Sequence, residues 1–205
     1  MDILATAGRT LAFSLAAGVN LYATVAMLGL AARFDLVSLP PQFQIFDNTW
    51  IIAGALVLYA IEFVADKVPW VDSLWDAVHT VVRPLGGALV AVTTLGEASP
   101  WLQALIAAAG GTLAAGGHFT KAGTRAVANV SPEPFSNWLF SLAEDVFVVG
   151  LGLLALTFPL AALLVTVLSV VVIVLAARKL IGWVRRAAAA TPPDDVSAPP
   201  AATAN

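Results

Sequence analysis

Long uncharged stretches, separated by prolines and charged residues, divide this chain into six apolar segments. The first contains 23 residues without a charge, enough to cross ~30 Å of hydrocarbon at 1.5 Å per residue. Pro159 separates the last two segments, because a proline inside a helix removes a backbone hydrogen bond. The predicted helices cover residues 10–32, 49–66, 72–96, 101–120, 135–157 and 160–183. The pattern predicts an all-α integral membrane bundle of about six transmembrane helices.

Lysine and arginine are distributed unequally between the two ends of these helices. Placing both termini in the cytoplasm puts on that side Arg9, Lys67, Lys121, Arg125, Arg178, Lys179, Arg185 and Arg186. The opposite side then holds Arg33, and Arg83 falls within a helix. Cytoplasmic loops carry the excess of basic residues in membrane proteins. We therefore expect both termini to be cytoplasmic.

Composition excludes several partners and kinds of site. The chain is 60% hydrophobic and 11% charged. Its formal net charge of −3 argues against a nucleic-acid partner, since the sequence has no dense basic face outside the last helix. It has no cysteine, which excludes disulfides and thiolate metal sites. Residues 1–186 are predicted to form one transmembrane domain. Residues 187–205, rich in Ala and Pro, are predicted to be a disordered tail.

Three charged residues, Arg83, Glu144 and Asp145, lie where helices should cross the membrane. A charge there costs at least ~2.5–3.5 kcal/mol and is usually paired. Counting the helical rise from Asp72 and Phe135 places these side chains at similar depths, about 13–16 Å into the bilayer. We predict that Arg83 pairs with Glu144 or Asp145. The alternative is a buried ion pair that fixes helix packing without binding anything.

Further polar residues lie on the helical faces that lead toward this pair. A lone structural pair would not need them, so they favour a cytoplasm-facing polar cavity. The predicted ligand-binding residues are Arg83, Glu144, Asp145, His79, Asp76, Glu62, Lys121 and Arg125. For His79 two interpretations are open, a proton relay or a packed histidine bonded to Asp76 or Glu62.

Metal ligands and cofactors are less clearly indicated. Oxygen and imidazole ligands suited to Mg²⁺, Mn²⁺ or Zn²⁺ could come from Glu62, Asp66, Asp72, Asp76 and His79. These residues form no recognisable metal-binding motif, so they are weak candidates. The sequence identifies no cofactor and no catalytic residue.

Three functions remain open. The first is a small carrier or ligand-binding membrane protein, with Arg83 as the counter-charge for an anionic small molecule or lipid headgroup. The second is an intramembrane enzyme acting on a lipid phosphate, which Lys67, His79, Arg83, Lys121 and Arg125 could contact. The third is an assembly subunit of a membrane complex that has no site of its own.

Several strings in the chain, AAGVNLYATV, EFVADKVPWVDSLWDAVHTVVRP, KAGTRAVANVSPEPFSNW and SLAEDV, resemble the bacterial membrane-protein family called domain of unknown function 4126. The resemblance covers roughly residues 15–160. It implies a multi-pass protein of the bacterial cytoplasmic membrane and supplies no catalytic residues.

Overall fold

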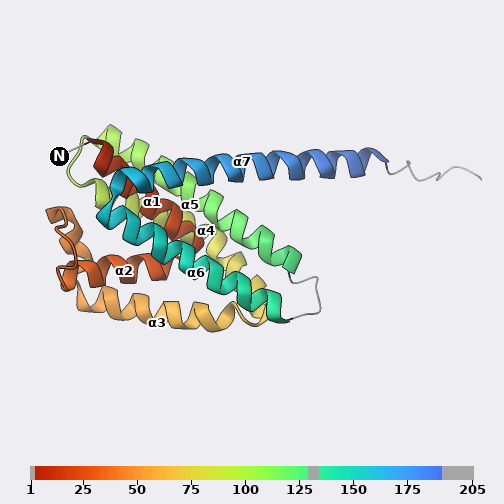
Figure 1. Cartoon of the computed structure of the whole chain (residues 1–205), viewed down its shortest axis with the longest axis horizontal. Helices are drawn as coiled ribbons and strands as arrows, with labels where there is room; N and C mark the ends of the chain where they lie inside the picture. Colours follow the sequence, from red (N-terminus) through yellow and green to blue (C-terminus); the bar gives the residue numbers. More distant parts are fainter. Residues whose placement is uncertain (1–2, 129–133, 191–205) are drawn as a thin grey trace, which may run out of the picture.

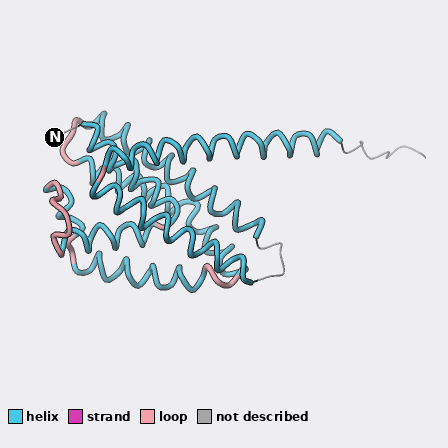
Figure 2. The backbone as a smooth tube through the Cα atoms, in the orientation of Figure 1, coloured by secondary structure: helices cyan, strands magenta, loops and turns pink. Residues whose placement is uncertain are grey.

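Helices make up all of the regular structure that the computed structural model describes, which covers residues 3–128 and 134–190 (Figures 1 and 2). The elements are α1 (Ile3–Val19), α2 (Leu21–Arg33), the short 3₁₀ helix η1 (Pro41–Phe46), α3 (Thr49–Ala65), α4 (Pro69–Leu95), α5 (Pro100–Ala128), α6 (Pro134–Thr157) and α7 (Pro159–Ala190). Five of these helices, η1 included, begin at a proline, which fits the first turn because its missing N–H would have no partner there.

Three of these helices are long and apolar enough to cross a membrane: residues 70–95 of α4, 138–157 of α6 and 159–182 of α7. α1, α2 and α3 are shorter apolar helices of 10–17 residues. The prediction of an all-helical protein with membrane-type helices is therefore confirmed.

The predicted first helix, residues 10–32, is broken in the structure. α1 ends at Val19 and α2 begins at Leu21, because Asn20 adopts an extended backbone (φ −146°, ψ 100°) between them. The Asn20 side chain caps α2 by accepting a hydrogen bond from the Ala23 amide at 2.9 Å. Neither a proline nor a charge marks this break, so the uniform hydropathy of the segment concealed it.

α1 is the central helix of the bundle and packs against α4, α5, α6 and α7 (Figure 1). Its side chains Phe13, Leu15 and Ala16 are buried. Small residues allow the close approach of α5, since a Cβ on Gly18 would lie 2.5 Å from the Ala114 Cα. This packing holds the broken end of α1 against the middle of α5.

The segment between α2 and α3 closes one end of the bundle. Phe43 of η1 is buried and packs edge-on against Phe13, with ring centroids 6.2 Å apart. Arg33 donates to the Asp47 carboxylate at 2.7 Å. At the end of α4, Gly96 has φ 81° and ψ −153°, a conformation that only glycine adopts readily.

α7 extends well beyond the rest of the bundle (Figure 1). Its apolar side chains are largely exposed, including Leu164, Val172 and Leu175, and they would face lipid in a membrane. The predicted tail starts at residue 187, and α7 is described to Ala190. Residues 191–205 lie outside the described residues, so the disordered tail stays a prediction.

Candidate ligand-binding site

Seven charged side chains from four segments meet inside the bundle, and we call them the charged cluster. They are Glu62 and Asp66 at the end of α3, Asp76 and Arg83 on α4, Lys121 and Arg125 on α5, and Glu144 on α6. Three are cations and four are carboxylates. Ionised throughout, the cluster would carry one net negative charge.

Arg83 lies at one end of the cluster and is fully buried. Its Nη2 donates to the Glu62 Oε1 at 2.7 Å, and its Nη1 lies 3.4 Å from the Asp76 Oδ1. Nη1 also donates to the His118 Nδ1 at 2.9 Å. Because a guanidinium can only donate, His118 accepts at Nδ1 and carries its proton on Nε2, which faces the Thr80 hydroxyl at 3.1 Å.

Lys121 and Arg125 continue the cluster toward α6. The Lys121 Nζ lies 3.1 Å from the Glu62 Oε1, 3.1 Å from the Asp66 Oδ2 and 3.6 Å from the Glu144 Oε2. Arg125 donates two hydrogen bonds to the Glu144 carboxylate, from Nε at 3.2 Å and from Nη2 at 2.7 Å, the bidentate geometry that suits a carboxylate. Arg125 also donates to the Asp66 carbonyl at 2.9 Å, which places a cation at the C-terminal end of α3.

Helical spacing explains why these residues can meet. Glu62 and Asp66 are four residues apart, as are Lys121 and Arg125, so each pair lies on one face of its helix. The acidic face of α3 therefore meets the basic face of α5, and Lys121 bridges both acids of α3. Spacing placed each pair on one helical face, and tertiary packing decided which faces meet.

The predicted pairing of Arg83 with Glu144 or Asp145 is wrong. Arg83 instead pairs with Glu62 and Asp76. Glu62 also bonds Lys121, and Lys121 lies between Arg83 and Glu144. Successive residues of a helix point about 100° apart. Glu144 accordingly faces Arg125, while Asp145 accepts from the Asn20 amide at 3.3 Å.

His79 lies outside the charged cluster. Its Nδ1 donates to the Trp75 carbonyl at 2.7 Å, so its Nε2 accepts from the Tyr22 hydroxyl at 2.9 Å. The ring stacks on Trp75 with centroids 4.6 Å apart. This is the packed histidine that the sequence left open, although its partners are Tyr22 and Trp75 and not Asp76 or Glu62.

The acidic residues considered as metal ligands are matched mainly with cations. Glu62, Asp66 and Asp76 contact Arg83, Lys121 or Arg125. Within the described parts of the chain, no group of three or more His, Asp or Glu side chains is arranged to hold a metal ion. Asp72 is buried and lines a cavity of about 280 Å³ between α4 and α5, together with Asp76, His118 and Arg125.

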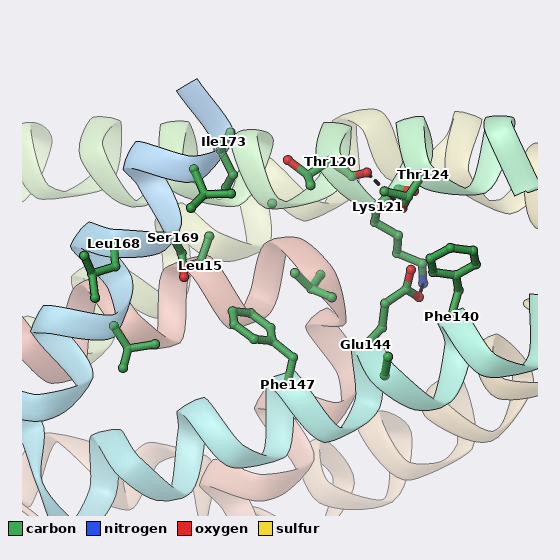
Figure 3. Close-up of a pocket in the computed structure, with 15 residues that line it drawn as sticks. Leu15, Thr120, Lys121, Thr124, Phe140, Glu144, Phe147, Leu168, Ser169 and Ile173 are labelled. Atoms are coloured by element: carbon green, nitrogen blue, oxygen red, sulfur yellow. Dashed lines mark hydrogen bonds and ion pairs between the residues drawn. The ribbon is translucent and has the colours of Figure 1, made fainter. Parts of the chain in front are cut away.

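A larger cavity of about 480 Å³ lies on the other side of the cluster, bounded by α1, α5, α6 and α7 (Figure 3). It is lined by Leu15, Val19, Gly117, Thr120, Lys121, Thr124, Phe140, Ala143, Glu144, Phe147, Val165, Leu168, Ser169, Val172 and Ile173. Lys121 and Glu144 point toward each other at one end, and Leu168 and Leu15 lie at the other. We expected a polar cavity around Arg83. This one is mostly apolar and meets the cluster at Lys121 and Glu144.

Some residues of the site were not predicted. Asn20 bonds Asp145 and Tyr22 bonds His79, and both lie at the start of α2, a helix whose one charged residue is Arg33. An asparagine in the middle of an apolar segment is the one sequence signal that could have indicated the break in the first helix. Asp66, considered before only as a metal ligand, contacts both Lys121 and Arg125.

A protein-family model described as Domain of unknown function (DUF4126) matches residues 7–179. No curated protein and no solved structure matches the chain. The matched range includes every residue of the charged cluster and of the cavity beside it.

Proposed function

The chain belongs to the DUF4126 family, and for this member we propose a small carrier or ligand-binding membrane protein whose site is the charged cluster where it borders the cavity at Lys121 and Glu144. The ligand's polar group would contact the cluster, and the rest of it would occupy the cavity. The observation that carries this proposal is the exposure of Glu144, whose side chain is 15% exposed while those of Lys121 and Arg125 are 1% exposed.

A purely structural role explains the cluster less well. Taking an ion pair out of water is costly, and well-packed apolar residues of similar volume are often as stabilising or more so. Seven buried charges therefore stabilise helix packing no better than apolar residues of similar volume would. Intramembrane ionisable residues usually mark a ligand or ion pathway instead.

We propose five membrane crossings, α3 to α7, in the inner membrane of a bacterial cell, with the end of α7 in the cytoplasm. α1 and α2 would form a hairpin that enters and leaves the membrane on the opposite side, because Thr10 bonds Thr94 at the end of α4 and Phe13 packs on Phe43 of η1. The expected sixth crossing with a cytoplasmic N-terminus does not fit this packing. The basic residues near the ends of these helices support the orientation. Transporter folds commonly place their sites at interrupted helices, and Asn20, where the chain turns from α1 into α2, bonds Asp145, next to Glu144.

An enzyme acting on a lipid phosphate finds less support. A phosphate site needs N–H donors that are free to bind the ligand. Lys121, Arg125 and the two Nη atoms of Arg83 are directed at Glu62, Asp66, Asp76 and Glu144, and the Arg83 Nε, which has no partner among the described residues, is buried. Lys67 lies elsewhere, with its Nζ bonded to the Phe63 carbonyl at 2.7 Å. An anionic headgroup would have to displace a carboxylate first.

Native mass spectrometry of the detergent-purified protein tests the proposal. We expect a discrete ligand mass on the wild type that is absent from Glu144→Gln, because the amide keeps the shape of the side chain and loses its charge. Glu97→Gln is the matched control, since Glu97 is exposed in the segment between α4 and α5. A bare polypeptide in all three samples, or the same ligand mass on Glu144→Gln, would contradict the proposal.

A further inference from the structure

The polar end of the 480 Å³ cavity offers hydrogen-bond acceptors. Each carboxylate oxygen has two lone pairs. The Glu144 Oε1 accepts one hydrogen bond, from the Arg125 Nε at 3.2 Å, whereas Oε2 faces both Arg125 and Lys121. Oε1 therefore keeps an acceptor position, on the most exposed side chain of the charged cluster.

Two hydroxyl groups in the same part of the cavity are also acceptors. The Thr120 hydroxyl donates to the Gly116 carbonyl at 2.8 Å, and the Thr124 hydroxyl donates to the Lys121 carbonyl at 2.8 Å. A hydroxyl has one hydrogen to donate and two lone pairs. With their hydrogens bonded to the backbone, both can only accept from a ligand.

Lys121 is the cation that lines the cavity at this end, and its donors are occupied. An ammonium group has three N–H donors. The Lys121 Nζ faces Glu62, Asp66 and Glu144 at 3.1, 3.1 and 3.6 Å. A ligand that donates hydrogen bonds can add to this end without breaking an ion pair, and it would also offset the net negative charge of the cluster.

The remainder of the cavity is shaped for hydrocarbon. Its walls away from Glu144 include Leu15, Phe147 and Val165. Leu168 and Val172 of α7 are 55% and 64% exposed at its rim, on a helix apolar enough to lie in lipid. A volume of about 480 Å³ is within the range of small-molecule pockets, and it is more consistent with one hydrocarbon chain than with a two-chain lipid.

We propose that this cavity binds a single-chain amphiphile with a primary ammonium head, the head bonded to Glu144 and the chain lying between α1, α6 and α7. This inference rests on the proposed function and names the ligand class of that site. The ammonium could belong to a free long-chain amine or to the ethanolamine head of a single-chain lipid. Only the ethanolamine lipid carries a phosphate, for which this end of the cavity supplies no free donor.

Binding of tritiated decylamine to the full chain in phosphatidylcholine nanodiscs tests this, with empty nanodiscs as the background. Decylamine is protonated at pH 7, as lysine is. We expect saturable binding, competition by unlabelled decylamine and none by decanoate. Glu144→Gln should weaken binding about tenfold or more, as loss of a charged hydrogen bond implies. Competition by lysophosphatidylethanolamine equal to that by decylamine would identify the ethanolamine lipid as the source of the ammonium.

A steric pair of variants separates this cavity from general partition into the protein–lipid boundary. Ala143→Phe fills the cavity without touching an ion pair and should abolish binding, whereas Ala161→Phe on exposed α7 does not line this cavity and should leave binding unchanged. Wild-type binding by Ala143→Phe, or stronger competition by decanoate than by decylamine, would overturn the ammonium proposal. If decylamine fails while the native ligand mass still depends on Glu144, the ligand class is wrong and the proposed function stands.

Discussion

Replacing Arg83 by methionine is expected to lower the free energy of unfolding by about 3–5 kcal/mol, the usual cost of removing one partner from a buried ion pair. The substitution leaves Glu62 with Lys121 as its remaining cation and leaves Asp76 without its guanidinium partner. The cluster would then hold two cations against four carboxylates. Unfolding of the purified protein in mixed micelles measures the loss.

Arg33→Met is the control for this variant. Arg33 pairs with Asp47 at 2.7 Å, but both side chains are about one third exposed. An exposed pair contributes about 0–1 kcal/mol, so this variant should lose far less stability. Equal losses for the two variants would contradict the burial assigned to Arg83. Since the single Arg83 variant is expected to be unstable, loss of ligand from it would not by itself separate binding from folding.

Asn20→Ala is expected to lower the free energy of unfolding by about 2–4 kcal/mol, combining the loss of a helix cap with the loss of a hydrogen bond to a partly buried carboxylate. Asn20 supplies both, through the Ala23 amide at 2.9 Å and the Asp145 Oδ1 at 3.3 Å. The same change should reduce ligand occupancy, because Asp145 is next to Glu144 on α6. Unfolding in mixed micelles and native mass spectrometry measure the two effects.

Asn48→Ala provides the matched comparison. Asn48 caps α3 by accepting from the Trp50 amide at 2.9 Å, but it is exposed and has no carboxylate partner. Its loss should cost about 0.5–2 kcal/mol, the effect of a cap alone, and leave ligand occupancy intact. If Asn20→Ala behaves like Asn48→Ala in both respects, the break between α1 and α2 has no connection to the site.

The positions of most helices could be predicted because prolines and charges bound them. Pro159, for example, begins α7 as expected. The predicted 101–120 helix runs on as α5 to Ala128, since no proline stops it after residue 120. Asn20 shows the limit of hydropathy, because a backbone break inside an uncharged segment leaves the average polarity unchanged.

The sequence analysis predicted most of the residues that form the site, but it did not predict which of them pair with each other. Glu62, Asp76, Arg83, Lys121, Arg125 and Glu144 meet in the structure, as the faces of their helices suggested. Helical rise gives the depth of a residue but not the rotation of one helix against another. Arg83 was therefore assigned partners on α6 from calculated depth alone, whereas in the structure it pairs with Glu62 of α3.

Removing the pair that borders the cavity, with Lys121→Met and Glu144→Gln in one protein, tests the central claim most directly. The change deletes one cation and one carboxylate, so the cluster keeps its net charge, and Arg125 keeps Asp66 as a partner. Unfolding and native mass spectrometry are measured on the same sample. A ligand site predicts a folded protein with stability close to the wild type and no bound ligand. A folded variant that still carries the wild-type ligand mass, or one that unfolds although the net charge of the cluster is unchanged, would contradict it.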